Sequence, residues 1–266
     1  MIKFKLDYIK EFVREKGRDG VIVAFSGGVD STTLAMICKD VVDVVAVTIE
    51  SEVMPRWEVR EALNIAKELG LKHHVIRVRL LSDENFVRNT RERCYFCKKV
   101  MIKRLKEFGK EIGIRTIFEG TNASDLKKHR PGYKAILEEK DVYSPWVEAG
   151  VTKEEIRIIA KDMGLKIYDK PSSPCLATRI PFGDSITLNK LRRIEKAEEI
   201  VRNILGVDVV RVRDHGNIAR IEVKREDRFK FIDTAMDEIV KRFKEIGYTY
   251  VTLDLEGYRE GSLLEY

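Results

Sequence analysis

The sequence predicts an α/β fold in which a parallel sheet is covered by helices, followed by a small C-terminal α+β domain. Two observations predict this fold. Short apolar runs alternate with helical stretches along the first part of the chain, a pattern typical of βαβ units and a parallel sheet. After the Pro- and Gly-containing loop PSSPCLATRIPFG, residues 171–183, the strands alternate between polar and apolar residues instead.

The first domain is expected to span residues 1–182, and an amphipathic helix opens it. Its strands are short runs rich in Val and Ile, and its helices repeat apolar residues every three or four positions. In chain order, the expected elements are strand 21–25, helix 31–39, strand 41–49, helix 55–69, strand 73–80, helix 98–113, strand 115–120 and helix 153–164. Right-handed crossovers make the carboxyl ends of the strands the expected ligand edge.

The second domain, residues 183–266, is expected to bind substrate and to make the protein a homo-oligomer. Its expected elements are helix 188–204, strands 207–214 and 218–224, helix 231–247 and strand 248–255. Because its strands alternate in polarity, one face of its sheet should be solvated or hold a ligand.

Composition limits the class of protein. The 44% hydrophobic and 35% charged residues are typical of a globular protein, and no apolar run is long enough for a membrane span. We therefore expect a cytoplasmic protein without a membrane partner. Thiols stay reduced in that compartment, so four cysteines indicate ligands or reactivity. The net charge of +6 suggests an anionic ligand, but 44 acidic residues dilute it, so it is weak evidence for nucleic acid and we expect no nucleic-acid partner.

The sharpest functional signal is AFSGGVDS, residues 24–31, where the first strand passes into a helix. Two glycines allow a tight turn whose N–H groups face an anion, and the helix start adds positive potential. The motif lacks the Gly-Lys-Ser/Thr ending of a Walker loop. The alternative is a Gly-rich turn with a capped helix. The expected ATP-binding residues here are Ser26, Gly27, Gly28, Asp30 and Ser31, of which Asp30 can also hold Mg²⁺.

A second nucleotide-side candidate is EGTNASD, residues 119–125, at the end of the fourth strand. Gly120 permits a close approach of the backbone to a ligand, and the Thr121 side chain can donate to a ribose or a phosphate. An ordinary capped turn explains the same residues equally well.

Three cysteines lie outside the expected helices and strands. Cys94 and Cys97 form a Cys-x-x-Cys pair, which fits a zinc site, a thioredoxin-like site or an iron–sulfur cluster. Together with Cys175 they fit a [4Fe–4S] cluster with one open iron, since structural zinc prefers four ligands. His129 and His215 remain possible fourth ligands. Cys38 sits in an apolar helix, where packing is the simpler interpretation.

Taken together, the motifs resemble those of a known family. SGGVDS resembles the PP-loop of the ATP pyrophosphatase superfamily, whose members cleave ATP between the α and β phosphates. With ERCYFCKK, EGTNASDLKKHRPG, PCLATRIPFG and RVRDHGNIARIEV in the same order, the sequence resembles the LarE family over nearly its whole length.

The resemblance implies an ATP-dependent sulfur transferase of nickel-pincer cofactor synthesis. Such an enzyme adenylates a carboxylate of a pyridinium dicarboxylate mononucleotide, releases pyrophosphate and inserts sulfur. Asp30, Ser31 and Cys175 are the implied catalytic residues. Some members donate sulfur from a single cysteine, but the trio here is similar to that of members that bind a [4Fe–4S] cluster. Sulfide or a sulfur-donor protein would then supply the sulfur.

The implied substrate contacts lie around the second domain. Arg211 and Arg213 alternate along one strand, so both point to one face, and they resemble the family's binders of the substrate phosphate or carboxylate. A solvated basic face is the alternative. Further candidate contacts are Thr178, Arg179 and Glu199.

Three rival functions remain open on the sequence. An iron–sulfur tRNA thiolase of the same superfamily is the first alternative, and its RNA binding would depend strongly on salt. An amidotransferase-type synthetase is the second, and a nucleotide and cluster sensor without turnover is the third.

Overall fold

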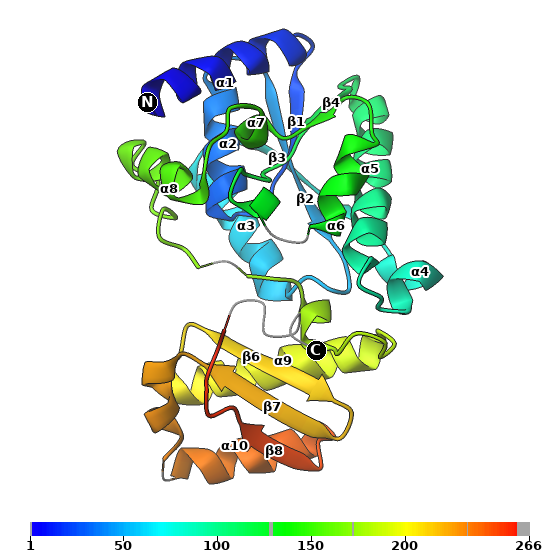
Figure 1. The fold of residues 1–266 in the computed structure, drawn as a ribbon, viewed down its shortest axis with the longest axis vertical. Coiled ribbons are helices and arrows are strands. Elements are labelled where there is room, and N and C mark those ends of the chain that lie inside the picture. The colour runs from blue at the N-terminus through cyan, green and yellow to red at the C-terminus, as the bar shows by residue number, and fades with distance from the viewer. Residues whose placement is uncertain (1, 128–129, 172, 233, 260–266) are drawn as a thin grey trace. The chain divides into compact units, whose positions relative to one another are not determined.

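The structure is a computed structural model that describes residues 2–127, 130–171, 173–232 and 234–259 (Figure 1). The chain divides into two units. Unit 1 comprises Met1–Leu80 and Glu92–Ser173, and unit 2 comprises Leu81–Arg91 and Pro174–Tyr266. The boundary expected between residues 182 and 183 thus falls inside unit 2, and the segment Leu81–Arg91 also belongs to that unit. His129, a possible cluster ligand, lies outside the described residues.

Unit 1 is built on a five-stranded parallel sheet with the order β3-β2-β1-β4-β5. Its strands are β1 (Val21–Ala24), β2 (Val44–Glu50), β3 (Lys72–Arg77), β4 (Thr116–Phe118) and β5 (Val142–Tyr143). β2 and β3 lie on one side of β1, and β4 and β5 lie on the other side. Ligands bind in such sheets where the strand order reverses, beyond the carboxyl ends of the strands. In unit 1 this position lies between β1 and β4.

Helices cover both faces of this sheet, as Figure 1 shows. The helices of unit 1 are α1 (Ile2–Lys16), α2 (Val29–Lys39), α3 (Arg56–Glu68), α5 (Arg93–Ile112), α6 (Pro131–Leu137), α7 (Pro145–Glu148) and α8 (Lys153–Asp162). Alternate strand residues point to opposite faces. Val21 and Val23 therefore pack with α1, α2, α3, α7 and α8, whereas Ile22 packs with α5 and α6.

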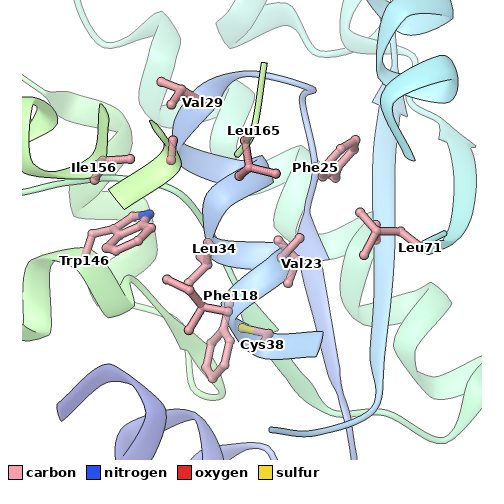
Figure 2. Packing of buried hydrophobic residues seen from close by; sticks show 14 of the residues in the cluster. Val23, Phe25, Val29, Leu34, Cys38, Leu71, Phe118, Trp146, Ile156 and Leu165 are labelled. Carbon is pink, nitrogen blue, oxygen red and sulfur yellow. The ribbon is translucent and has the colours of Figure 1, made fainter. Parts of the chain in front are cut away.

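Helix α2 is at the centre of the larger core cluster (Figure 2). Its buried side chains Leu34 and Cys38 pack among Val23 of β1, Phe118 of β4 and Trp146 of α7. Cys38 is fully buried, which confirms its interpretation as a packing residue, and burial raises the pKa of its thiol. Because α2 is held on several sides, the loop that precedes it has a fixed position.

Unit 2 contains the small sheet β6-β7-β8, formed by β6 (Val210–His215), β7 (Ile218–Val223) and β8 (Tyr250–Leu253). β6 and β7 are antiparallel, and β8 pairs parallel to β7. Apolar side chains from one face of the sheet pack on α9 (Leu188–Leu205) and α10 (Thr234–Glu245). The short elements α4 (Glu84–Val87), η3 (Leu176–Arg179) and η4 (Arg225–Phe231) complete the unit, and η1 (Leu80–Ser82) lies at its border with unit 1.

The predicted α/β class is confirmed, and the structure differs from the sequence prediction at the Cys-x-x-Cys segment and in several short elements, among them α4, α6 and α7. Cys94 and Cys97 were expected in a loop, but they lie in the first turns of α5, which begins at Arg93 rather than at residue 98. That segment lacks Gly and Pro, so its backbone can continue the helix beyond the apolar repeat. The strand β5 was not predicted, because two residues carry too little periodicity to identify.

Candidate functional site

The loop between β1 and α2 is closed by its own hydrogen bonds. The backbone N–H of Ser26 donates to Ser31 Oγ over 3.1 Å, and the two hydroxyl oxygens also lie 3.1 Å apart. Gly27 has φ of +69°, and a Cβ there would lie 2.9 Å from the Cα of Ala62. Two separate effects therefore disfavour a side chain at this position, namely backbone strain at this φ and the close approach of α3.

The start of α2 is open to an anion. Gly28 is its N-cap and provides no side-chain hydrogen bond to the first N–H groups of the helix. Helix N-termini without such a cap leave donors for another acceptor, and the helix dipole favours a negative one. The predicted phosphate loop thus has the geometry of an anion site, while ATP contacts for its individual residues remain a prediction.

Asp30 lies in the first turn of α2, and its two carboxylate oxygens have different surroundings. Oδ2 accepts from Lys153 Nζ over 2.6 Å, whereas Oδ1 is buried without a hydrogen-bond partner among the described residues. Burial raises the pKa of this carboxyl, and the Lys153 ammonium opposes that rise. A buried carboxylate oxygen without a protein donor is typical of a position that binds an ion or a water. Carboxylate oxygens are the ligands that Mg²⁺ prefers, so Asp30 fits the predicted magnesium ligand.

Lys153 reaches this site because the start of α8 is fixed. Thr152 and Glu155 form a capping box, in which each side chain accepts from the backbone N–H of the other residue. Lys153 is the first residue of the helix, and its N–H donates to Ser124 Oγ over 3.1 Å. The amine is thus held between the two loops that the sequence assigned to the nucleotide.

The loop after β4 lies directly against the phosphate loop. A Cβ at Gly120 would lie 3.2 Å from the N atom of Ser31 and from the Cβ of Asp30, so a side chain there would press against the start of α2. Glu119, which is buried, accepts from the backbone N–H and the hydroxyl of Thr121 over 3.1 and 2.8 Å. The structure therefore brings Gly120 against the start of α2, while nucleotide contacts of Gly120 and Thr121 remain a prediction.

The Cys-x-x-Cys pair lies at the same edge of the sheet. Because α5 follows β3 and precedes β4, its first turn lies beyond the carboxyl ends of the parallel strands. Cys94 is exposed and Cys97 is half-buried, and Lys98 Nζ lies 3.2 Å from Glu119 Oε2. Residues three apart share one face of a helix, so the two cysteines lie on the same side of α5.

In unit 2, the two strand arginines do lie on one face of the small sheet, away from its apolar core. Arg213 is paired bidentately with Glu222, over 3.0 and 2.7 Å, and also donates to the carbonyl of Thr178. Arg211 donates to the carbonyl of Val210, and its guanidinium lies 5.3 Å from the Tyr258 ring centroid. Burial, followed by the nearby Arg179 charge, lowers the pKa of Arg211. Its role in binding substrate remains a prediction.

Arg179 organises the segment that carries Cys175. It is fully buried and forms two hydrogen bonds to Glu198 of α9, at 2.7 and 3.2 Å. The same guanidinium donates to the carbonyl of Cys175 over 3.0 Å and to Thr178 Oγ1 over 2.9 Å. These contacts describe a residue that positions the cysteine segment, and a direct phosphate contact of Arg179 remains a prediction.

The remaining predicted residues of unit 2 have contrasting surroundings. Thr178 is half-buried and donates to the carbonyl of Cys175 over 2.8 Å. Glu199 is exposed and paired with Lys196, while the adjacent Glu198 is the buried carboxylate. His215, at the end of β6, is exposed as well. Within the described residues, no group of three or more His, Cys, Asp or Glu side chains is arranged to hold a metal ion.

Comparison with known proteins decides the family. A family model described as NAD synthase matches residues 1–96. An uncharacterized protein of Synechocystis is 38% identical, covering 99% of this chain and 98% of its own. The pyridinium-3,5-bisthiocarboxylic acid mononucleotide synthase of Lactiplantibacillus plantarum is 34% identical, covering 91% of this chain and 88% of its own. The chain belongs to the LarE family.

This LarE-family chain is therefore an ATP-using enzyme, a sulfur transferase.

A more distant relative, the glutamine-hydrolyzing GMP synthase of Aeropyrum pernix, is 28% identical over 74% of this chain and 42% of the length of that synthase. None of the helices in the described part of the chain has both the length and the apolar composition that a membrane span requires.

Sequence reasoning missed three residues of this LarE-family chain that contact candidate site residues. Lys153 contacts both nucleotide-side loops, Glu119 holds Thr121 within the second of them, and Glu198 holds Arg179. Glu119 sits inside a motif that the sequence singled out, so its position at a strand end was a usable signal. Lys153 and Glu198 look like ordinary helix charges in the sequence, and only the tertiary contacts distinguish them.

Proposed function

We propose that the enzyme adenylates a carboxylate of a pyridinium dicarboxylate mononucleotide and then replaces one of its oxygens with sulfur, in nickel-pincer cofactor synthesis. The acceptor carboxylate attacks the α-phosphorus of ATP and releases pyrophosphate. Sulfide then attacks the acyl carbon, so that a C–S bond forms and the C–O bond to AMP breaks. The observation that carries the proposal is the meeting of phosphate loop, Gly120 loop and Cys-x-x-Cys pair at one edge of the sheet.

The phosphate loop supplies the leaving-group chemistry of this proposal. The N–H groups at the open start of α2 and the Ser26 and Ser31 hydroxyls would donate hydrogen bonds to the departing pyrophosphate. Donors that are already oriented stabilise charge as it develops, which is how such loops accelerate a displacement. Asp30 Oδ1 would hold Mg²⁺ on the phosphates, with Lys153 fixing the other oxygen of the same carboxylate.

The proposed resident cofactor is a [4Fe–4S] cluster bound by Cys94, Cys97 and Cys175. Cys94 and Cys97 lie three residues apart on one face at the start of α5, where Cys94 is exposed and Cys97 is half-buried. Cys175 is half-buried at the N-cap of η3, in a segment that Arg179 orders. When bound, the cluster would supply an iron site for the sulfur that is transferred.

The arginine face of unit 2 is the proposed site for the phosphate or second carboxylate of the acceptor. Three arginines, Arg211, Arg213 and Arg220, share that face of the sheet with the carboxylate of Glu222. Glu222 pairs with Arg213 and Arg220, and Asp254 also pairs with Arg220, so carboxylates balance part of this charge. The forked donors of arginine suit phosphate and carboxylate groups.

Arg211→Ala should weaken acceptor binding about tenfold or more, because a charge-assisted hydrogen bond contributes about 1.5–3 kcal/mol. ATP affinity should stay within about twofold, since Arg211 belongs to unit 2 and the phosphate loop to unit 1. Isothermal titration calorimetry with the dicarboxylate mononucleotide measures the change. Arg213→Ala is a less clean variant because it also breaks the buried pair with Glu222.

Arg242→Ala is the matched control, since Arg242 is an exposed arginine of α10 that forms an ion pair with Glu238. It should leave both affinities unchanged. Equal acceptor affinity in the Arg211→Ala variant and the wild type would show that this face is only a structural basic surface.

The acceptor class is tested by pyrophosphate release from ATP in the presence of either the mononucleotide or tRNA. We expect release to depend on the mononucleotide and to be insensitive to tRNA. Stimulation by tRNA, lost steeply as salt rises, would instead support the tRNA thiolase.

A further inference from the structure

The first turns of α5 carry both cysteines but contribute little to the apolar core. From Cys94 to Val100 every side chain is exposed or half-buried, and the first buried apolar side chain of the helix is Ile102. Packing therefore fixes the later turns of α5 more firmly than the turns that bear the thiols. Polar contacts must hold these first turns in place.

These polar contacts connect the first turns of α5 to two different segments, the end of α6 and the loop after β4. Tyr95 donates its hydroxyl to Glu138 over 2.7 Å, and Lys99 pairs with Glu139 over 2.8 Å, so both hold α5 to the end of α6. Lys98, the residue next to Cys97, points elsewhere. Its amine lies 3.2 Å from the carboxylate of Glu119, which follows β4 at the nucleotide edge.

Glu119 connects several segments through one buried carboxylate. Besides Lys98, it accepts from the Ser144 hydroxyl and from both the N–H and the hydroxyl of Thr121. The adjacent Gly120 lies against the start of α2. Two contacts thus connect the phosphate loop with the cysteine pair. Gly120 lies against the start of α2, and its chain neighbour Glu119 pairs with Lys98, the chain neighbour of Cys97. The donors from Ser144 and Thr121 do not involve Lys98, so they remain to hold Glu119 and the Thr121 loop when Lys98 is replaced.

We propose that Lys98 is a positioning residue, which acts through Glu119 to hold the cysteine-bearing turns of α5 against the nucleotide loop. ATP binding restrains the Thr121 loop and, through this pair, also the turns that carry Cys94 and Cys97. The sulfur-transfer half of the reaction depends on this placement, whereas the adenylation half does not. This inference deepens the proposed function and rests on it for the sulfur-transfer readout.

Lys98→Met tests the inference because it keeps the aliphatic stem and removes the ammonium. AMP formation should stay within about twofold of wild type, while thiolated product per AMP should fall about tenfold, since small misplacements of reacting groups are costly. Lys98→Arg should restore the ratio, because arginine can also pair with Glu119. The matched control is Lys99→Met, a neighbour of similar exposure whose contacts lead to α6. It should leave the ratio unchanged.

Hydrogen–deuterium exchange of residues 93–100 in the full-length protein provides a readout that needs no acceptor. A non-hydrolysable ATP analogue should slow exchange there in the wild type and in Lys99→Met, but not in Lys98→Met. Slowing in Lys98→Met equal to that in the wild type would overturn the inference, as would an unchanged product ratio. If the wild type released no pyrophosphate, the proposed function would fail while the exchange experiment still decided the role of Lys98.

Discussion

Asp30→Ala and Ser31→Ala should each lower the rate of AMP and pyrophosphate formation by at least about 100-fold. Asp30 carries the buried oxygen proposed for Mg²⁺, and the Ser31 hydroxyl closes the phosphate loop against Ser26. Removing either group takes away an interaction that strengthens as the pyrophosphate departs. A coupled pyrophosphate assay and AMP quantification measure the loss.

Asp43→Ala is the control for the aspartate variant, because Asp43 is exposed and immediately precedes β2, at the opposite edge of the same sheet. It should retain wild-type turnover. Thermal melting should show that both loop variants remain folded. Full turnover in the Asp30→Ala and Ser31→Ala variants would remove the phosphate loop from the chemistry.

Cys94→Ala, Cys97→Ala and Cys175→Ala should each abolish iron binding and sulfur transfer, because the three ligands act as a unit. Cys38→Ala is the control, since Cys38 is fully buried in the core of unit 1 and should leave the iron content unchanged. Iron and acid-labile sulfide are measured on protein purified without oxygen, with zinc assayed beside them.

The mass of the chain after turnover distinguishes two sources of the transferred sulfur. The sulfur comes either from sulfide delivered through the cluster or from a cysteine of the chain itself, which loses its sulfur. With sulfide supplied to the reconstituted protein, we expect an unmodified chain and several products per protomer. A chain lighter by one H₂S, with the change mapped to Cys175, would contradict the cluster mechanism even if iron were present.

The position of the β1–α2 loop and its need for glycine could be predicted from the sequence because the signal is local. Gly27, Gly28 and the start of α2 are adjacent in the chain, so backbone requirements and helix position can be read together. The Gly120 loop was recognised for a related reason, since the strand predicted over residues 115–120 ends in glycine. In both cases the fold then determines which edge of the sheet the loop occupies.

What the sequence did not predict depends on contacts between distant residues. Lys153 lies 123 residues from its partner Asp30, and nothing near Lys153 in the chain indicates that role. Glu198 and Glu199 are neighbours in one helix, yet only the first turns inward to Arg179. The start of α5 was misplaced for another reason, because the apolar repeat that predicts a helix begins after the cysteines.

The most direct test of the central claim follows oxygen from the acceptor into AMP. Adenylation of a carboxylate joins one of its oxygens to the α-phosphorus, and replacement of that oxygen by sulfur leaves it on AMP. With an ¹⁸O-labelled carboxylate acceptor, ATP and sulfide, we predict one ¹⁸O in the phosphate of AMP for each sulfur incorporated, with unlabelled pyrophosphate. Label in inorganic phosphate with ADP as the coproduct, or thiolated product formed with unlabelled AMP, would contradict the account.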